Sequence, residues 1–349
     1  MRVVVVGATG NVGTSVVRVL ATDENVSSIV GVARRLPGWR IDRTDWRQAD
    51  VASADLTRIF DGADAVVHLA WLFQPTRDPA TTWRANVLGS MRVFRAVAEA
   101  GVPALIHASS VGAYSPGPKD RPVDESWPTH GWPGAAYGRE KAYVERVLDV
   151  FENDHRSVRV VRMRPAFIFQ RVAATEQRRL FGGPLVPRRL VQPGRIPFVP
   201  DIPGLRLQVV HAEDAAEAYR LAVTRPVKGA FNIAAEPVLD PHDLAKLLDA
   251  RTVRVAPGLA RAAMAAGWHL RLLPAAPGLF DMALRLPVMR VDRAREVLGW
   301  TPRRSSWETM REMFEGLHDG AGMDTAPLAP DGGPVGRVKE FVSGVGGRP

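Results

Sequence analysis

The chain has 349 residues, of which 46% are hydrophobic and 24% are charged, as in ordinary globular proteins. Cysteine is absent, which excludes disulfide scaffolds, thiolate zinc sites and thiol nucleophiles and fits a reducing compartment. The N-terminal residues do not form a signal peptide, and no stretch reaches the roughly 18 uninterrupted apolar residues of a membrane span. We therefore expect a cytoplasmic protein of one large or two moderate domains, with no integral membrane segment.

Lysine and arginine exceed the acidic residues by nine, and this surplus is densest between residues 156 and 195. The excess indicates either an anionic ligand near this stretch or merely an arginine-rich composition, and the sequence leaves both open. The eight histidines lack metal-ligand spacing, so we expect no metal site. The nine tryptophans are not interleaved with basic residues, so we expect no nucleic-acid partner.

In the first half of the chain, short β-branched runs alternate with segments of helical period. The predicted strands are 3–6, 28–33, 65–69, 104–109 and 159–163, and the predicted helices are 14–21, 56–60, 83–100 and 137–151. The strands are continuous apolar runs, which is typical of a parallel sheet covered on both faces. This pattern predicts an α/β fold with a Rossmann-type doubly wound parallel sheet.

The second half is less regular. It predicts strands at 207–210 and 230–233, a helix that begins near residue 212 with Asp214 in its first turn, a helix at 241–249, and short helices between 257 and 289. We assign residues 1–165 to a Rossmann domain that also receives elements from about 205–235, and residues 166–315 mainly to a smaller helix-rich C-terminal substrate lobe. Residues 319–349 are rich in glycine and proline, and we predict a flexible tail there.

Between the first strand and the first helix lies a glycine-rich turn, Gly7-Ala8-Thr9-Gly10-Asn11-Val12-Gly13. Glycine permits a tight turn with positive φ and lets the backbone approach a pyrophosphate, while the following helix N-terminus offers N–H groups to the anion. The alternative is a tight turn that binds nothing. The position between a buried strand and a helix favours a dinucleotide site.

The end of the second strand indicates which dinucleotide binds. A carboxylate usually stands there to hold the adenosine ribose, but this chain has Ala33 followed by Arg34 and Arg35. Guanidinium groups suit a 2′-phosphate, so we favour NADP over NAD. The alternative is that both arginines are solvated loop charges.

A second group of residues has the chemistry of proton transfer. Tyr137 and Lys141 lie one turn apart on a predicted helix, where the ammonium together with an oxidised nicotinamide can lower the pKa of the phenol. Ser109 and Ser110 end the strand 104–109, at the edge of the sheet where such folds bind ligands. Taken singly, the first pair resembles a surface helix pair and the serines resemble strand caps.

Together these features resemble the extended short-chain dehydrogenase/reductase family, in its NAD-dependent epimerase/dehydratase branch. The likeness covers roughly residues 1 to 315. It rests on the glycine turn, Asp50-Val51, His68-Leu69-Ala70, Asn86, Ser110 four residues before Tyr114, Tyr137 with Lys141, Arg164-Pro165, and the segments 210–214, 231–233 and 298–302.

The resemblance implies that Tyr137 is the general acid/base, that Lys141 lowers its pKa and holds the nicotinamide ribose, and that Ser110 positions the substrate oxygen. It further implies an NAD(P)-binding domain at 1–165 and a homodimer formed through the helices around 86–100 and 137–151. The expected cofactor contacts are Gly7, Thr9, Gly10, Asn11, Val12, Gly13, Arg34, Arg35, Asp50, Val51, Leu69, Ala70, Asn86, Tyr137, Lys141 and Pro165.

The chain departs from the sugar-nucleotide epimerases of this branch at three places. Phe167 and Leu207 stand where an asparagine and an arginine usually contact the diphosphate sugar, and Trp71 replaces a small residue beside the expected cleft. We therefore predict an NADP-dependent oxidoreductase acting on a hydrophobic small molecule. The alternatives are a nucleotide-sugar epimerase or dehydratase and, third, a non-catalytic NADP-binding regulator.

Overall fold

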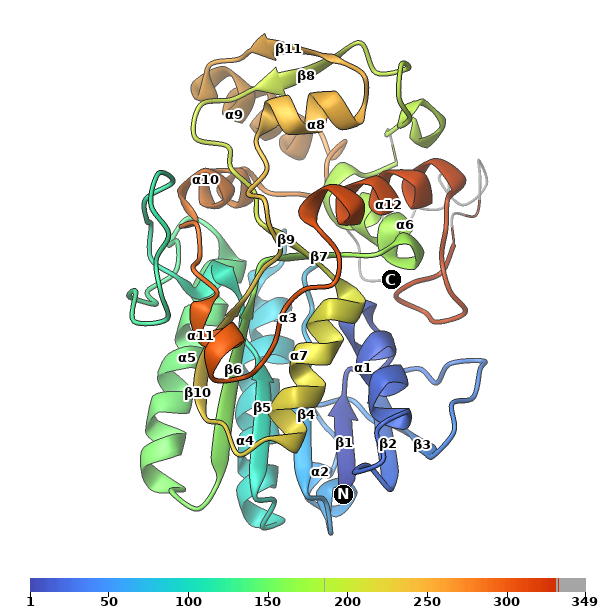
Figure 1. The fold of residues 1–349 in the computed structure, drawn as a ribbon, viewed down its shortest axis with the longest axis vertical. Helices are drawn as coiled ribbons and strands as arrows, with labels where there is room; N and C mark the ends of the chain where they lie inside the picture. The colour runs from blue at the N-terminus through green and yellow to red at the C-terminus, as the bar shows by residue number, and fades with distance from the viewer. Residues whose placement is uncertain (185, 331, 333–349) are drawn as a thin grey trace.

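Seven parallel strands form the central sheet of the larger, lower part of the molecule in a computed structural model that describes residues 1–184, 186–330 and 332 (Figure 1). The order reverses direction between β1 and β4, as in a doubly wound sheet. The predicted fold class is therefore confirmed. Across the sheet the strands are β10 (Gly229–Ile233), β6 (Arg159–Pro165), β5 (Ala104–Ala108), β4 (Ala65–His68), β1 (Arg2–Val6), β2 (Ser28–Ala33) and β3 (Thr44–Gln48).

Helices cover both faces of this sheet. Alternate residues of β1 point to opposite layers, so Val3 packs with one buried cluster and Val4 with the other. The helices α1 (Asn11–Ala21) and α7 (Ala212–Thr224) contribute to the first cluster. The opposite cluster is built with α2 (Leu56–Phe60), α4 (Gly89–Glu99) and α5 (Ala136–Asp154).

Two elements of the first half differ from the prediction. The edge strand β3 was not predicted because its sequence, Thr-Asp-Trp-Arg-Gln, is polar and half exposed, without an apolar run. The predicted helix 83–100 is divided into α3 (Pro79–Trp83), a π-helical turn η1 (Arg84–Leu88) and α4. The π-helical turn carries Asn86, one of the predicted site residues, and such turns are frequent at functional sites.

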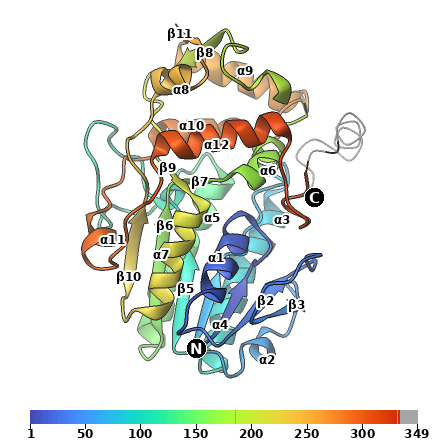
Figure 2. The same cartoon turned by 45° about the vertical axis from the view of Figure 1, so that its right-hand side comes forward.

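The strand expected at 207–210 is shifted and lies outside the central sheet. Val209–His211 forms β9, which pairs with β7 (Phe167–Phe169) in a separate two-stranded sheet between the two parts of the molecule (Figure 2). Of the segment 205–235, β10 joins the central sheet, and α7 together with Val210 of β9 packs in the first buried cluster. Asp214 lies in the first turn of α7, as predicted, and its carboxylate accepts a hydrogen bond from the backbone of Arg304.

The smaller upper part is helix-rich and contains a second two-stranded sheet (Figures 1 and 2). It consists of α6 (Ala174–Gln177), a π-helical turn η4 (Arg178–Gly182), β8 (Phe198–Asp201), α8 (Pro241–Leu247), β11 (Arg251–Arg254), α9 (Pro257–His269), α10 (Pro277–Arg285) and α12 (Ser306–Asp319). The short helix α11 (Asp292–Glu296) packs beside β10 instead. Short 3-10 turns lie at Val111–Ala113, Arg171–Ala173 and Arg188–Leu190.

The first residues of the predicted flexible tail are packed against the protein. Thr325 and Leu328 are buried, and the guanidinium of Arg179 donates to the carbonyls of Pro327 and Ala329 at 2.7 and 2.9 Å. These contacts contradict the prediction for residues 320–330. The rest of the predicted tail, apart from residue 332, lies outside the described residues.

The arginines between 156 and 195 are mostly engaged within the protein. Arg159 donates to the carbonyls of Ala222 and Val227, and Arg188 donates to that of His318. Other members pair with buried or exposed carboxylates. These contacts favour a structural role for the arginine-rich stretch over the anionic ligand that the sequence left open.

Within the described residues, no helix is long and apolar enough to cross a membrane.

Candidate active site

The glycine turn has the geometry of a phosphate-binding cradle. Gly7 has φ of +88°, and a Cβ placed on it would come within 2.6 Å of the backbone nitrogen of Ala70. A Cβ on Gly13 would collide with the carbonyl oxygen of Gly7. Helix α1 follows with Gly10 at its N-cap and without a side-chain cap, so no side chain occupies the anion-binding end of the helix.

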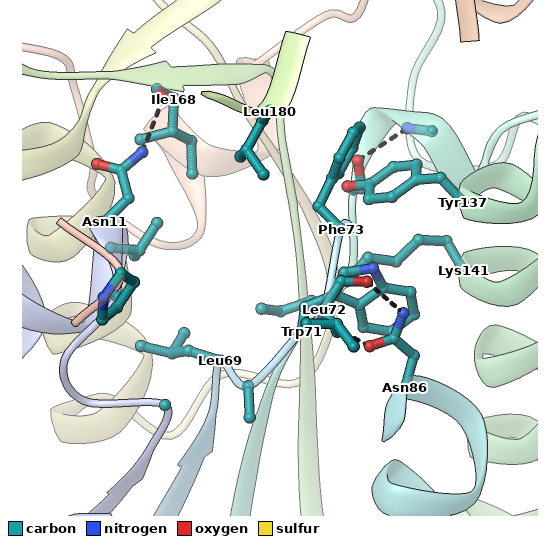
Figure 3. Close-up of a pocket in the computed structure, with 18 of the residues that line it drawn as sticks. Asn11, Leu69, Trp71, Leu72, Phe73, Asn86, Tyr137, Lys141, Ile168 and Leu180 are labelled. Carbon is teal, nitrogen blue, oxygen red and sulfur yellow. Dashed lines mark hydrogen bonds between the residues drawn. The ribbon is translucent and has the colours of Figure 1, made fainter. Parts of the chain in front are cut away.

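One cavity of about 620 Å³ extends from this turn to the helix that carries Tyr137 (Figure 3). It brings together residues at the carboxyl ends of strands β1 to β6 of the central sheet and residues from the upper part of the molecule. Arg35 is the exception among the predicted residues, since it is exposed and does not line the cavity. The predicted residues that line it are Gly7, Thr9, Gly10, Asn11, Val12, Gly13, Arg34, Asp50, Val51, Leu69, Ala70, Asn86, Ser110, Tyr137, Lys141 and Pro165.

Ser110 and Tyr137 meet at the carboxyl end of β5. The Ser110 hydroxyl accepts a hydrogen bond from the backbone of Gly112 at 3.0 Å and is also hydrogen-bonded to the Tyr137 phenol. A Cβ on Gly112 would lie 2.6 Å from Cε1 of Tyr137, so only glycine leaves room for the ring. The sequence analysis missed Gly112, although its place two residues after Ser110 is a usable signal.

Lys141 does not point its ammonium at the phenol. Its Nζ donates to the carbonyl of Ala108 at 2.7 Å and lies 3.4 Å from the ring centroid of Trp71. Burial raises the pKa of Tyr137 to about 12, and burial lowers the pKa of Lys141 to about 7. Desolvation of the phenolate therefore dominates in the protein alone, whereas the predicted lowering of the tyrosine pKa also invokes an oxidised nicotinamide and stays a prediction.

A buried ion cluster lies beneath the site. Glu145, on the turn of α5 after Lys141, is fully buried and accepts hydrogen bonds from Ser109 at 2.6 Å and from Nε of Arg164 at 2.9 Å. Arg162 adds a third contact at 2.9 Å. Burial alone would raise the pKa of Glu145, but the two guanidiniums and Ser109 lower it to about 2. The cluster fixes α5 to the ends of β5 and β6.

Asn86 lines the cavity, but its side chain binds the protein itself. Its amide exchanges two hydrogen bonds with the backbone of Leu72, at 2.6 and 2.8 Å, and donates to Glu140 at 2.7 Å (Figure 3). Glu140 is buried and also accepts from Thr82 at 2.6 Å. Asn86 therefore links α5 to the segment that carries Trp71. The sequence analysis did not identify Glu140, because a carboxylate between two helices gives no local pattern.

The end of the cavity away from the glycine turn is apolar. Phe167 and Leu207 both line it, while Arg206 is exposed and donates to the carbonyl of Lys119. Among the described residues, the charged side chains lining the cavity are Arg34, Asp50, Lys141 and Glu176. The apolar lining of this end consists of Trp71, Leu72, Phe73, Phe167, Leu180, Phe181, Leu207, Met264, Leu279, Phe280, Met282 and Leu286.

In the part of the chain that the structure covers, no three histidine or acidic side chains lie close enough together to hold a metal ion.

Curated relatives include two different kinds of enzyme. The chain is 30% identical over 164 residues to a UDP-glucose 4-epimerase of Mycolicibacterium smegmatis, a match covering 44% of this chain and 52% of the epimerase. It is 29% identical over 326 residues to a 3-diazoavenalumate denitrifying reductase of a Streptomyces species, covering 88% of this chain and 98% of the reductase. The chain thus spans about half the length of the epimerase and nearly all of the reductase.

Solved structures confirm the fold. The UDP-glucose 4-epimerase of Thermotoga maritima with UDP-glucose superposes with a TM-score of 0.67 at 20% identity, covering 91% of this chain and 99% of that one. MoeE5 in complex with UDP-glucuronic acid and NAD gives 0.68 at 20% identity and the same coverage. The model of the NAD dependent epimerase/dehydratase family matches residues 3–234. The chain belongs to the NAD dependent epimerase/dehydratase family.

Proposed function

We propose that this protein is an NADP-dependent oxidoreductase that interconverts the carbonyl and alcohol forms of a hydrophobic small molecule. The observation that carries the proposal is the apolar end of the cavity next to Tyr137. Phe167 and Leu207 form part of its wall, and neither can donate a hydrogen bond to a diphosphate. An apolar wall instead stabilises a substrate with a large hydrophobic surface.

Different residues of the chain would bind different parts of the cofactor. The turn from Gly7 to Gly13 would hold the pyrophosphate with backbone N–H groups, and Asp50 and Val51 would contact the adenine. Arg34 lines the cavity where β2 ends, with Ala33 in the usual place of a carboxylate, which suits a 2′-phosphate. Bound NADPH supplies a hydride to the carbonyl carbon of the substrate.

Ser110 and Tyr137 bind and protonate the oxygen of the substrate. Ser110 holds the carbonyl oxygen, and the Tyr137 phenol donates its proton to that oxygen as the carbonyl carbon gains the hydride, so that an alcohol forms. Because burial raises the pKa of Tyr137 to about 12, the phenol carries its proton at neutral pH. Lys141 holds the nicotinamide ribose and supplies positive charge as the tyrosinate forms. This ionisation state favours reduction over oxidation at neutral pH.

The second candidate function is a nucleotide-sugar epimerase. Several similar proteins and structures are named as UDP-glucose 4-epimerases, which favours this candidate. Such an enzyme removes and returns a hydride on one substrate, so no cofactor is consumed. A non-catalytic NADP-binding regulator remains the third candidate, and the presence of Ser110, Tyr137 and Lys141 in one cavity disfavours it.

The first experiment is a thermal-shift comparison of NADP-loaded protein with saturating uridine, thymidine and guanosine diphosphates. Ligand at 100-fold over its Kd stabilises a protein by about 2.7 kcal/mol, or several degrees. We expect no shift, together with NADPH oxidation when aromatic and alicyclic ketones are added. A shift with one nucleotide and no NADPH consumption would establish the epimerase instead.

We further propose a homodimer and a cytoplasmic location. Apolar side chains are exposed on η1, α4 and α5, where Leu88, Met91, Tyr143 and Val150 have exposed fractions between 37% and 60%. A second copy of the chain would bury them. Sedimentation should show a dimer that Val150→Asp dissociates, and a monomeric wild-type protein would refute this assembly. The cysteine-free composition fits the reducing cytoplasm.

A further inference from the structure

Trp71 makes contacts that the proposed reaction has not yet used. It follows β4 on the segment that Asn86 holds through Leu72, and its side chain lines the cavity (Figure 3). The Nζ atom of Lys141 lies 3.4 Å from the centroid of the indole, and the rings of Trp71 and Tyr137 meet edge to face with centroids 6.0 Å apart. One side chain therefore touches both residues proposed for proton transfer.

The indole of Trp71 makes its polar contact through the ring face and not through its N–H group. Its Nε1 atom is buried without a hydrogen-bond partner among the described residues, which costs free energy. The π face, by contrast, receives an ammonium at the distance of a direct cation–π contact. Trp71 thus stabilises a cation with its ring face, while its own N–H group is left without a hydrogen bond.

We propose that Trp71 is a positioning residue of this active site, whose indole face and the carbonyl of Ala108 together hold Lys141 as an ammonium beside Tyr137. The proposal rests on the proposed function, because the cation matters through the proton that Tyr137 transfers. Of the three N–H bonds of the ammonium, one goes to the carbonyl. A second donor faces the indole, which leaves the third for the cofactor ribose.

The need for such a support follows from the surroundings of Lys141. The side chain is 3% exposed, and burial lowers its pKa to about 7. Glu140 and Glu145, on the same helix, favour the charged form, but both carboxylates are bound to other groups. His68 on β4 and His107 on β5 are buried with lowered pKa values and are neutral. The indole at 3.4 Å and the carbonyl of Ala108 at 2.7 Å are thus the nearest partners of the cation, while the centroid of the Tyr137 ring lies farther away, at 5.9 Å.

A direct titration of Lys141 tests this role of Trp71 without an activity assay. The sequence contains five lysines, so protein labelled with 13C at lysine Cε gives few signals, and the loss of one signal in Lys141→Arg identifies it. We expect Trp71→Leu to lower the pKa of Lys141 by about one unit and Trp71→Phe to lower it by less. Phe73→Leu is the matched control, because the ring centroid of Phe73 lies 5.1 Å from that of Tyr137, whereas the aromatic rings near the Lys141 ammonium are those of Trp71 and Tyr137.

The direction in which the pKa of Lys141 changes in Trp71→Leu tests the role of the indole. A pKa that is unchanged or raised in Trp71→Leu would overturn the proposal, because it would mean that the indole only excludes water from the ammonium. An equal fall in Phe73→Leu would also overturn it. NADPH binding and thermal melting report whether each variant is folded. If Trp71→Leu does not fold, Trp71→Phe, which keeps a ring, takes its place in the titration.

The kinetic consequence separates this role from the proposed function. The pH above which kcat for NADPH oxidation declines should fall in the order wild type, Trp71→Phe, Trp71→Leu. If no substrate is reduced, the proposed function fails while the titration still judges Trp71. If reduction proceeds with the same pH limit in all three proteins, the role of Trp71 is refuted and the function stands.

Discussion

Replacing Glu145 with glutamine should destabilise the protein strongly, because it removes the anion at the centre of the cluster beneath the active site. Glu145 is fully buried, and Arg164, which is 5% exposed, has no other carboxylate partner among the described residues. Arg162 keeps Asp149 and Glu152 at 2.7 and 2.9 Å. Leaving a buried guanidinium unpaired costs about 3–5 kcal/mol. At about 2 °C per kcal/mol, the melting temperature should fall by about 6–10 °C.

Denaturant unfolding of Glu145→Gln, Arg164→Met and the double variant measures the coupling. The double variant should be less destabilised than the sum of the two single changes, because no charge is left alone. The pH dependence has a defined sign. The pKa of Glu145 is lowered from 4.5 to about 2 in the folded state, so its stabilising effect is present above pH 4.5 and is lost as the pH falls towards 2. A variant within 1 kcal/mol of wild type, with the same acid limb, would refute this account.

Three further changes have expected outcomes. Arg34→Ser should weaken NADPH binding about 10- to 100-fold with little effect on NADH binding, because it removes a charge-assisted contact with the 2′-phosphate. Fluorescence titration measures both affinities, and equal losses for the two cofactors would contradict the cofactor assignment. Gly112→Ala should lower kcat about 100-fold by displacing the tyrosine ring, whereas Gly258→Ala, where a Cβ meets nothing within 4 Å, should not. The rate of NADPH-dependent reduction should decline as the pH rises past about 7, because Lys141 loses its charge while the phenol keeps its proton, and a rate that rises there would speak against that order.

The cofactor end of the site could be predicted from sequence because its signals are local. The turn from Gly7 to Gly13 joins one strand to one helix, so spacing alone places its backbone at the cavity. Tyr137 and Lys141 are one helical turn apart and share a face for the same reason. Ala33 ends a strand that is itself an apolar run, and Arg34 follows it directly.

The remaining features depend on contacts between distant segments. Glu145 and Arg164 are 19 positions apart on different elements, and Asn86 and Glu140 are 54 apart, so no window of sequence reveals either pairing. The strand β3 is stabilised by pairing with β2, although Asp45 and Arg47 are polar. The burial that raises the pKa of Tyr137 to about 12 in the protein alone is likewise not visible in the sequence, because the rings of Trp71 and Phe73 that pack on the phenol come from a distant segment.

In the proposed NADPH-dependent carbonyl reduction, Tyr137 donates the proton to the substrate oxygen. The most direct test is Tyr137→Phe assayed by single-turnover NADPH oxidation with a ketone that the wild type reduces, alongside the NADPH dissociation constant. We predict that the rate falls about 100- to 10,000-fold while NADPH binds as tightly as before, because the phenyl ring keeps the packing and lacks the proton. A variant that oxidises NADPH at the wild-type rate would contradict the claim.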